Sequence, residues 1–171
     1  MRIYVDATTL IALGTVDELD LLHCFDGNIV IPPAVREEVT TEPARSALTR
    51  FYERDGSNKS EKPDATTIED ARSILGDDEV TGDVQLVAAI LERDGNVAIV
   101  SDDRRVRTVA RGLGARVTGT IGVVVRAVEE GLPATDANAL VDRIDDHGLH
   151  MTGELRATDY TLNENADGTD E

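Results

Sequence analysis

The sequence has one cysteine, no tryptophan and few aromatic residues, and each scarcity excludes a class of structure. Cys24 is alone, so the chain forms no internal disulfide, and a zinc site built on cysteine would need histidine partners. The three histidines, His23, His147 and His150, form no H-E-x-x-H pattern or other paired-ligand spacing. Aromatic residues are 3% of the chain, so the core must be built from the aliphatic residues that dominate its 40% apolar content.

Long hydrophobic segments are absent too. No apolar run approaches the roughly 20 residues that a membrane-spanning helix needs, and Met1 leads directly into the apolar residues 3–5 without a signal-peptide pattern. A soluble cytoplasmic protein with no membrane partner is the simplest interpretation. The length of 171 residues fits one domain. We expect this domain at residues 1–155, followed by an acidic tail at 156–171 that is predicted to be disordered.

Lysine is scarce, whereas acidic residues are in large excess. Lys59 and Lys62 are the only lysines, and 34 acidic residues give a net charge of −17. This composition is similar to that of halophilic proteins from salt-accumulating archaea. In dilute buffer such a charge would oppose nucleic-acid binding, but at about 1 M salt the Debye length is about 3 Å, so long-range repulsion is largely screened. The net charge therefore does not exclude RNA as a partner.

The motifs of several common enzyme classes are missing. No G-x-G-x-x-G follows the first predicted strand and no G-K-[ST] occurs, which argues against dinucleotide-binding and P-loop enzymes. No serine or cysteine lies in a nucleophile elbow. A phosphohydrolase with an aspartate nucleophile would need a second Asp where the segment Asp6-Ala7-Thr8 has threonine.

Short apolar segments alternate with helical patterns along the chain. This alternation predicts an α/β fold with a mainly parallel central sheet, and in such sheets the functional residues lie at the carboxyl ends of the strands. Asp17 is expected to cap a short helix that contains the leucines of residues 19–22. The predicted strands are residues 2–5, 28–31, 97–100 and 115–117, and the other main helices are expected near residues 8–13, 33–39, 42–54, 67–75, 82–94, 104–113, 119–130 and 135–146.

Acidic residues lie at the ends of two predicted strands. Asp6 follows the first strand, whereas Asp102 and Asp103 follow the third. Glu38 lies in the helix after the second strand, and Asp83 begins the helix before the third. If these strands are neighbours, the carboxylates converge on one edge and repel one another unless a cation neutralises them. Hard oxygen ligands favour Mg²⁺ or Mn²⁺ over zinc, and such an ion supports phosphodiester hydrolysis.

Each acidic residue also has an ordinary structural explanation, because Asp and Glu are abundant throughout the chain. Asp6 fits a simple helix cap, and Asp83 fits a favourable charge at a helix N-terminus. Glu38, beside Glu37, fits a solvated surface. Only the joint pattern favours a metal site.

Four segments resemble, in order and at compatible spacing, the motifs of PIN domains. Many relatives have Glu where this chain has Asp83. The later segment at residues 115–123 and the helices after it resemble the uncharacterised, VapC-like prokaryotic branch of the family, and the resemblance covers residues 2–155. The four segments are IYVDATTLI at 3–11, IPPAVREEV at 31–39, GDVQLVA at 82–88 and VSDDRR at 100–105.

The resemblance implies a three-layer α/β/α sandwich and an endonuclease that cleaves single-stranded RNA with Mg²⁺ or Mn²⁺. The catalytic carboxylates implied by the motifs are Asp6, Glu38, Asp83 and Asp103. The metal would be held by Asp6, Asp83 and either or both of Asp102 and Asp103, a choice that stays open. Many members are toxins inhibited by an antitoxin, and many are dimers, so both partners are expectations.

Five further polar residues complete the predicted site. Thr8 and Ser101 would hydrogen-bond the carboxylates or a metal-bound water. Arg104, Arg107 and Arg111 share one helical face just beyond the carboxylates and could bind RNA phosphates, although they could equally pair with nearby acidic residues. The alternative to a ribonuclease is a catalytically silent module of the same fold that binds RNA or a protein.

Overall fold

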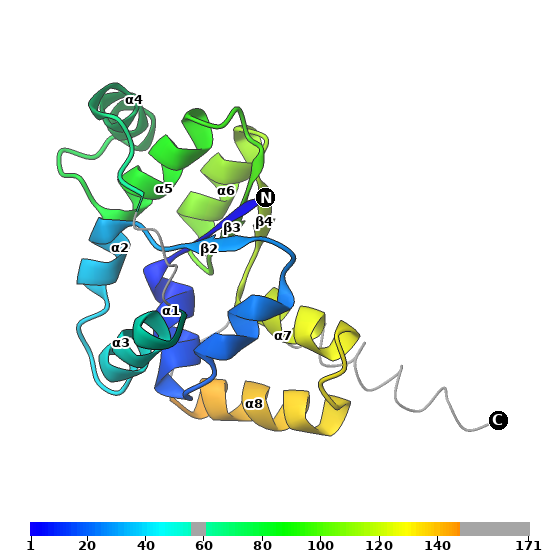
Figure 1. Ribbon diagram of the computed structural model, residues 1–171. Helices are drawn as coiled ribbons and strands as arrows, with labels where there is room; N and C mark the ends of the chain where they lie inside the picture. The colour runs from blue at the N-terminus through cyan, green and yellow to red at the C-terminus, as the bar shows by residue number, and fades with distance from the viewer. Residues whose placement is uncertain (56–60, 148–171) are drawn as a thin grey trace.

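The computed structural model describes residues 1–55 and 61–147. Its described part contains a four-stranded sheet in the order β2-β1-β3-β4, and every strand pair is parallel (Figure 1). The predicted parallel α/β fold is therefore confirmed, whereas the predicted tail at 156–171 lies outside the described residues. The strands are β1 (Arg2–Val5), β2 (Asn28–Val30), β3 (Val97–Val100) and β4 (Arg116–Thr118).

Helices cover both faces of this sheet, as the three-layer prediction requires. Figure 1 shows α5 and α6 on one side of β1 and β3, with α1 on the other side. None of the described helices has the length and apolar character needed to cross a membrane. The helices are α1 (Ala7–Thr15), the 3₁₀ helix η1 (Leu19–Cys24), α2 (Pro33–Glu38), α3 (Ala44–Asp55), α4 (Ala65–Leu75), α5 (Gly82–Leu91), α6 (Arg104–Gly112), α7 (Thr120–Glu129) and α8 (Ala134–Asp146).

Local sequence explains several of the helix boundaries. Pro33 begins α2, where its fixed φ suits the first turn and its missing N–H is not needed. Gly76 ends α4 in the left-handed conformation, with a φ of +71°. The prediction that Asp17 caps the following helix is wrong. Its φ of 59° turns the chain after α1, its carboxylate pairs with Arg50, and Glu18 precedes η1.

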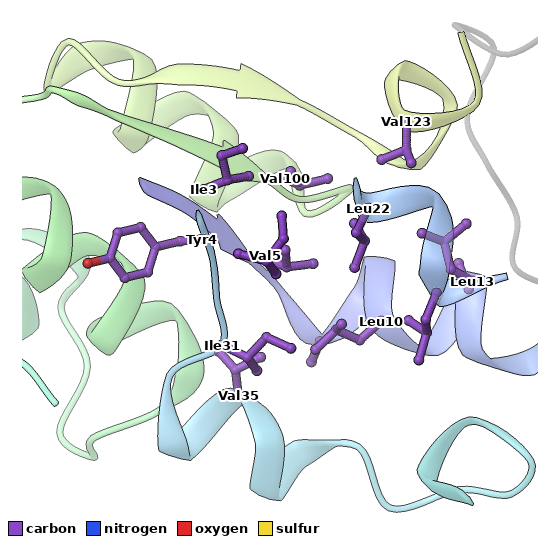
Figure 2. Close-up of a cluster of buried hydrophobic side chains, with 14 of the residues drawn as sticks. Ile3, Tyr4, Val5, Leu10, Leu13, Leu22, Ile31, Val35, Val100 and Val123 are labelled. Atoms are coloured by element: carbon purple, nitrogen blue, oxygen red, sulfur yellow. The ribbon is translucent and has the colours of Figure 1, made fainter. Parts of the chain in front are cut away.

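The core between the layers is aliphatic, as the scarcity of aromatic residues predicts. Figure 2 shows Val5 and Val100 from neighbouring strands beside Leu10 and Leu22, which reach in from α1 and η1. Strand β1 is buried over its last three residues, so it runs through the centre of the molecule. The tightly packed middle of the sheet therefore fixes the positions of the residues that follow β1 and β3.

Candidate active site

Asp6 is the most buried carboxylate described at the carboxyl edge of the sheet, with 2% of its surface exposed. Its backbone N–H donates to the carbonyl of Val100, so the end of β1 is fixed against β3. Its Oδ1 accepts the N–H of Ala7 at 2.7 Å, which makes Asp6 the N-cap of α1. Its Oδ2 accepts hydrogen bonds from the hydroxyls of Thr8 at 2.9 Å and Ser101 at 2.6 Å. Asp6 is thus a helix cap and also a buried, oriented acidic group.

Burial and hydrogen bonding have opposite effects on the pKa of Asp6. Burial raises the pKa most, the hydroxyls of Ser101 and Thr8 lower it, and the charge of Asp103 raises it again. The pKa stays above the ordinary value because desolvation outweighs the hydrogen bonds. A nearby cation would remove this penalty.

Ser101 and Thr8 connect the loops that leave β1 and β3. The hydroxyl oxygen of Ser101 accepts the backbone N–H of Asp103 at 3.0 Å while its proton is donated to Asp6. The hydroxyl oxygen of Thr8 accepts the N–H of Asp102 at 3.3 Å. The two hydroxyl residues therefore hold the pair of aspartates after β3 in a fixed position relative to Asp6.

Asp83 enters the site from the first turn of α5. The pKa of its half-buried carboxyl is raised to about 6, first by desolvation and then by the charges of Asp6, Asp103 and Glu38. The charges of all three residues act on Asp83, so these four residues are together called the acidic group. They come from the end of β1, from α2, from α5 and from the β3–α6 loop, which are far apart in the sequence.

The carboxylate of Glu38 is held at the N-terminus of α5 by Gly82, the residue before Asp83. Its Oε1 accepts the backbone N–H of Gly82 at 2.7 Å. A Cβ at position 82 would lie 2.7 Å from Oε2 of Glu38 and 2.9 Å from Cγ2 of Val35, so only glycine allows this approach. In the sequence Gly82 belongs to the third PIN-like segment, but nothing there indicates its contact with Glu38.

The adjacent aspartates after β3 face different neighbours. Asp103 is the N-cap of α6 and accepts the N–H of Val106 at 2.9 Å through Oδ1. Asp102 is directed towards α7, where its Oδ1 accepts the N–H of Thr120 at 2.9 Å and its Oδ2 accepts the Thr120 hydroxyl. Asp103 contributes to the raised pKa values of Asp6 and Asp83. Asp103 thus belongs to the acidic group, and Asp102 anchors the start of α7.

Arg104, Arg107 and Arg111 lie on α6 as expected, and their binding of RNA stays a prediction. Arg104 and Arg111 are exposed, and Arg107 lies beside Gly119 at the start of α7. Arg105, which the predicted set does not include, interacts with Asp83 and Asp103 of the acidic group. Its Nη2 lies 2.6 Å from Oδ2 of Asp77, and the charges of Asp77, Asp83 and Asp103 contribute to raising its pKa.

The donor chemistry of this edge fits a hard divalent cation. Its groups are carboxylates whose burial and neighbouring charges raise the pKa values of Asp83 and Asp6, which is the situation a bound cation would relieve. Within residues 1–55 and 61–147, no three acidic, histidine or cysteine side chains are arranged as a ready-made ion site. Glu38 is engaged by Gly82 and Asp103 by Val106, so these side chains would have to turn towards a common ion.

The structure thus combines a parallel α/β sheet with a group of carboxylates at the carboxyl edge of that sheet. This combination is typical of an acidic hydrolytic centre. A family model described as a PIN domain matches residues 2–160, and the chain belongs to this family. PIN domains are generally nucleases, so the fold is of the nuclease type. No curated protein matches the chain. The predicted PIN resemblance is confirmed, and the VapC-like subtype stays a prediction.

Proposed function

We propose that the protein is a divalent-metal-dependent endoribonuclease that hydrolyses phosphodiester bonds in single-stranded RNA. The observation that carries the proposal is the pKa of Asp83, which is raised to about 6 first by desolvation and then by the charges of Asp6, Asp103 and Glu38. A purely structural surface would spread these charges apart, because like charges at close range oppose folding. Strongly perturbed groups gathered from separate elements are typical of functional sites.

The acidic residues have two kinds of role in this proposal. Asp6, Asp83 and Asp103 would hold Mg²⁺ or Mn²⁺, which supplies an activated water and stabilises charge on the phosphate. Ser101 and Thr8 orient Oδ2 of Asp6 through the two hydroxyl hydrogen bonds. Glu38 fixes the first turn of α5 through Gly82, and its charge contributes to the raised pKa of Asp83.

Cleavage of a labelled single-stranded RNA in the presence of Mn²⁺ tests the activity, measured from low to molar salt because the chain carries a charge of −17. The wild type should release fragments only with the metal, and Asp6→Asn should abolish release. Asp70→Asn, on the exposed surface of α4, is a control with the same change in charge. Calorimetry provides a second readout, in which Mn²⁺ affinity should fall in Asp6→Asn and not in Asp70→Asn. Absent cleavage, together with equal Mn²⁺ affinity in all three proteins, would refute the proposal.

A toxin role, an antitoxin partner, a homodimer and a cytoplasmic location extend this proposal and derive from the family resemblance and the sequence. Expression in a host cell tests the toxin role directly. Wild-type protein should arrest growth and Asp6→Asn should not. Should both proteins bind RNA without cutting it, the alternative of a catalytically silent RNA-binding module would replace the enzyme.

A further inference from the structure

The acidic group alone would repel the strand that it is proposed to cut. The group contains four carboxylates, and a single divalent ion offsets only part of their charge. The chain has very little lysine, so a positive side chain beside the group must be an arginine. Arginine also suits this task, because its planar guanidinium can donate two hydrogen bonds to one phosphate.

Arg105 is placed beside the group by the fold. It is the second residue of α6, two positions after the N-cap Asp103, and its charge interacts with those of Asp83 and Asp103. Its Nη2 forms the ion pair with Asp77 and donates to the carbonyl oxygen of Leu75 at 3.1 Å. About half of its side chain, 47%, remains exposed, so a ligand can reach the guanidinium.

The ion pair with Asp77 is not needed to hold the turn that follows α4. Arg72 already fixes this turn, because its guanidinium donates to the carbonyl oxygens of Asp77 and Asp78 and pairs with Glu69. The backbone N–H of Asp77 also donates to the carbonyl of Arg72. Arg105 can therefore leave Asp77 without releasing the turn, and partly exposed ion pairs of this kind contribute little free energy.

We propose that Arg105 binds a phosphate group of the RNA strand and that Asp77 is the carboxylate it leaves when RNA arrives. The inference rests on the ribonuclease function proposed above. The exchange replaces one anionic oxygen by another on the same guanidinium, so no proton is transferred. Asp77 then competes with RNA for Arg105. Removing the charge of Arg105 should therefore weaken RNA binding, and removing the charge of Asp77 should tighten it.

The test uses four variants in a background of Asp6→Asn, which keeps the RNA intact. Fluorescence anisotropy with a labelled single-stranded RNA, measured with Mn²⁺ present, gives the Kd of each. Arg105→Gln should weaken binding about tenfold, as expected for one charge-assisted contact, and should reduce the slope of log Kd against log salt by about 0.7. Asp77→Asn should tighten binding about threefold, because Arg105 no longer has a competing partner.

The control pair is Arg50 and Asp17, another exposed ion pair with 2.8 Å between its charged atoms, beyond the far end of α1. Arg50→Gln and Asp17→Asn change the net charge by the same amounts, so they measure the general charge effect on Kd. Opposite shifts in Arg105→Gln and Asp77→Asn, each larger than in its control, support the inference.

Two outcomes would overturn it. If both Arg105→Gln and Asp77→Asn weaken binding, the ion pair only stabilises the local structure and Arg105 does not exchange Asp77 for RNA. If neither differs from its control, or if the background protein binds no RNA, Arg105 holds no phosphate. Thermal unfolding of each variant verifies that it is folded. Cleavage of RNA by the wild-type protein is measured in a separate assay. A failure of that assay counts against the ribonuclease proposal, whereas the binding assay tests only the role of Arg105.

Discussion

Ser101 donates a hydrogen bond from its hydroxyl to Oδ2 of Asp6 over 2.6 Å, and this bond joins the end of β3 to the end of β1. Both residues are buried, so water does not readily replace the bond. Ser101→Ala should raise the pKa of Asp6 further, since a bond that lowers this pKa is lost. The variant should lose about 10- to 100-fold in metal affinity or activity, the usual cost of removing a group that orients a metal ligand.

Mn²⁺ titration and cleavage rates measured against pH test this prediction. The acidic limb of the pH–rate profile should move to higher pH in Ser101→Ala. Ser73→Ala is the matched control, because the Ser73 hydroxyl donates to the carbonyl of Glu69 on exposed α4. Equal losses in the two serine variants would contradict a specific role for Ser101.

The sequence predicts the sheet well because its signals there are local. The apolar segments at residues 2–5 and 97–100 are strands with the predicted bounds, and each leads into an acidic residue. Their neighbouring positions, with Val5 aligned to Val100, bring Asp6 and Asp103 close together. The strand ends predict the proximity of these acidic residues only on the condition that the two strands are neighbours, and the structure meets this condition.

Features that depend on tertiary contacts could not be predicted in this way. Asp102 and Asp103 are adjacent and chemically identical, and only the position of α7 directs Asp102 to Thr120. A helical-face argument counts residues along α6 alone, so it omits Arg105, whose neighbour Asp77 comes from the turn after α4. The φ of 59° at Asp17 is likewise a consequence of chain direction after α1, not of a capping pattern.

The close approach of Glu38 to Gly82 leads to a second prediction. In Gly82→Ala, the new Cβ would lie 2.7 Å from Oε2 of Glu38 and 2.9 Å from Val35, so the carboxylate must move away from α5. Cleavage should fall at least tenfold, and stability should fall by about 1 to 3 kcal/mol from overpacking. Gly112→Ala is the control, because nothing lies within 4 Å of its Cβ. The free energy of unfolding of Gly112→Ala should rise by about 0.5 to 1 kcal/mol, since alanine favours a helix.

Urea unfolding measures the free energy of unfolding of both glycine variants. Similar values for Gly82→Ala and Gly112→Ala would refute the close contact.

The raised pKa of Asp83 leads to a prediction about stability in the absence of metal. In the folded protein the pKa is about 6, above its ordinary value of 3.8, so folding favours the protonated form. The stabilisation from this protonation is fully present below about pH 3.8 and is lost as the pH rises through about 6. Asp83→Asn should therefore be more stable than wild type at pH 7, by about 1 to 2 kcal/mol after allowance for solvent screening.

Unfolding by urea in EDTA at several pH values measures this difference. The advantage of Asp83→Asn should shrink below pH 6 and be absent near the ordinary pKa of 3.8. Adding Mn²⁺ should reverse the order at pH 7, because the metal stabilises only a protein that binds it. A difference that does not vary with pH would show that Asp83 is not electrostatically coupled to its neighbours.

The last prediction separates the two aspartates after β3. Asp102→Ala removes both hydrogen bonds to Thr120 at the start of α7 and should cost about 0.5 to 2 kcal/mol, the range for losing a side-chain acceptor at a helix N-terminus. Its Mn²⁺ affinity should stay close to that of wild type. Asp103→Asn keeps an amide oxygen for the N–H of Val106, and asparagine caps helices as well as aspartate does, so its stability should change little.

Calorimetric Mn²⁺ binding and urea unfolding are measured on both variants. Asp103→Asn should lose Mn²⁺ affinity and cleavage, because it removes one of the charges that act on Asp6 and Asp83. The opposite pattern, with Mn²⁺ affinity lost in Asp102→Ala and kept in Asp103→Asn, would transfer the ligand role to Asp102. Loss of Mn²⁺ affinity in both variants would mean that metal binding needs Asp102 and Asp103 together. The start of α7 and the acidic group would then be coupled through the loop after β3.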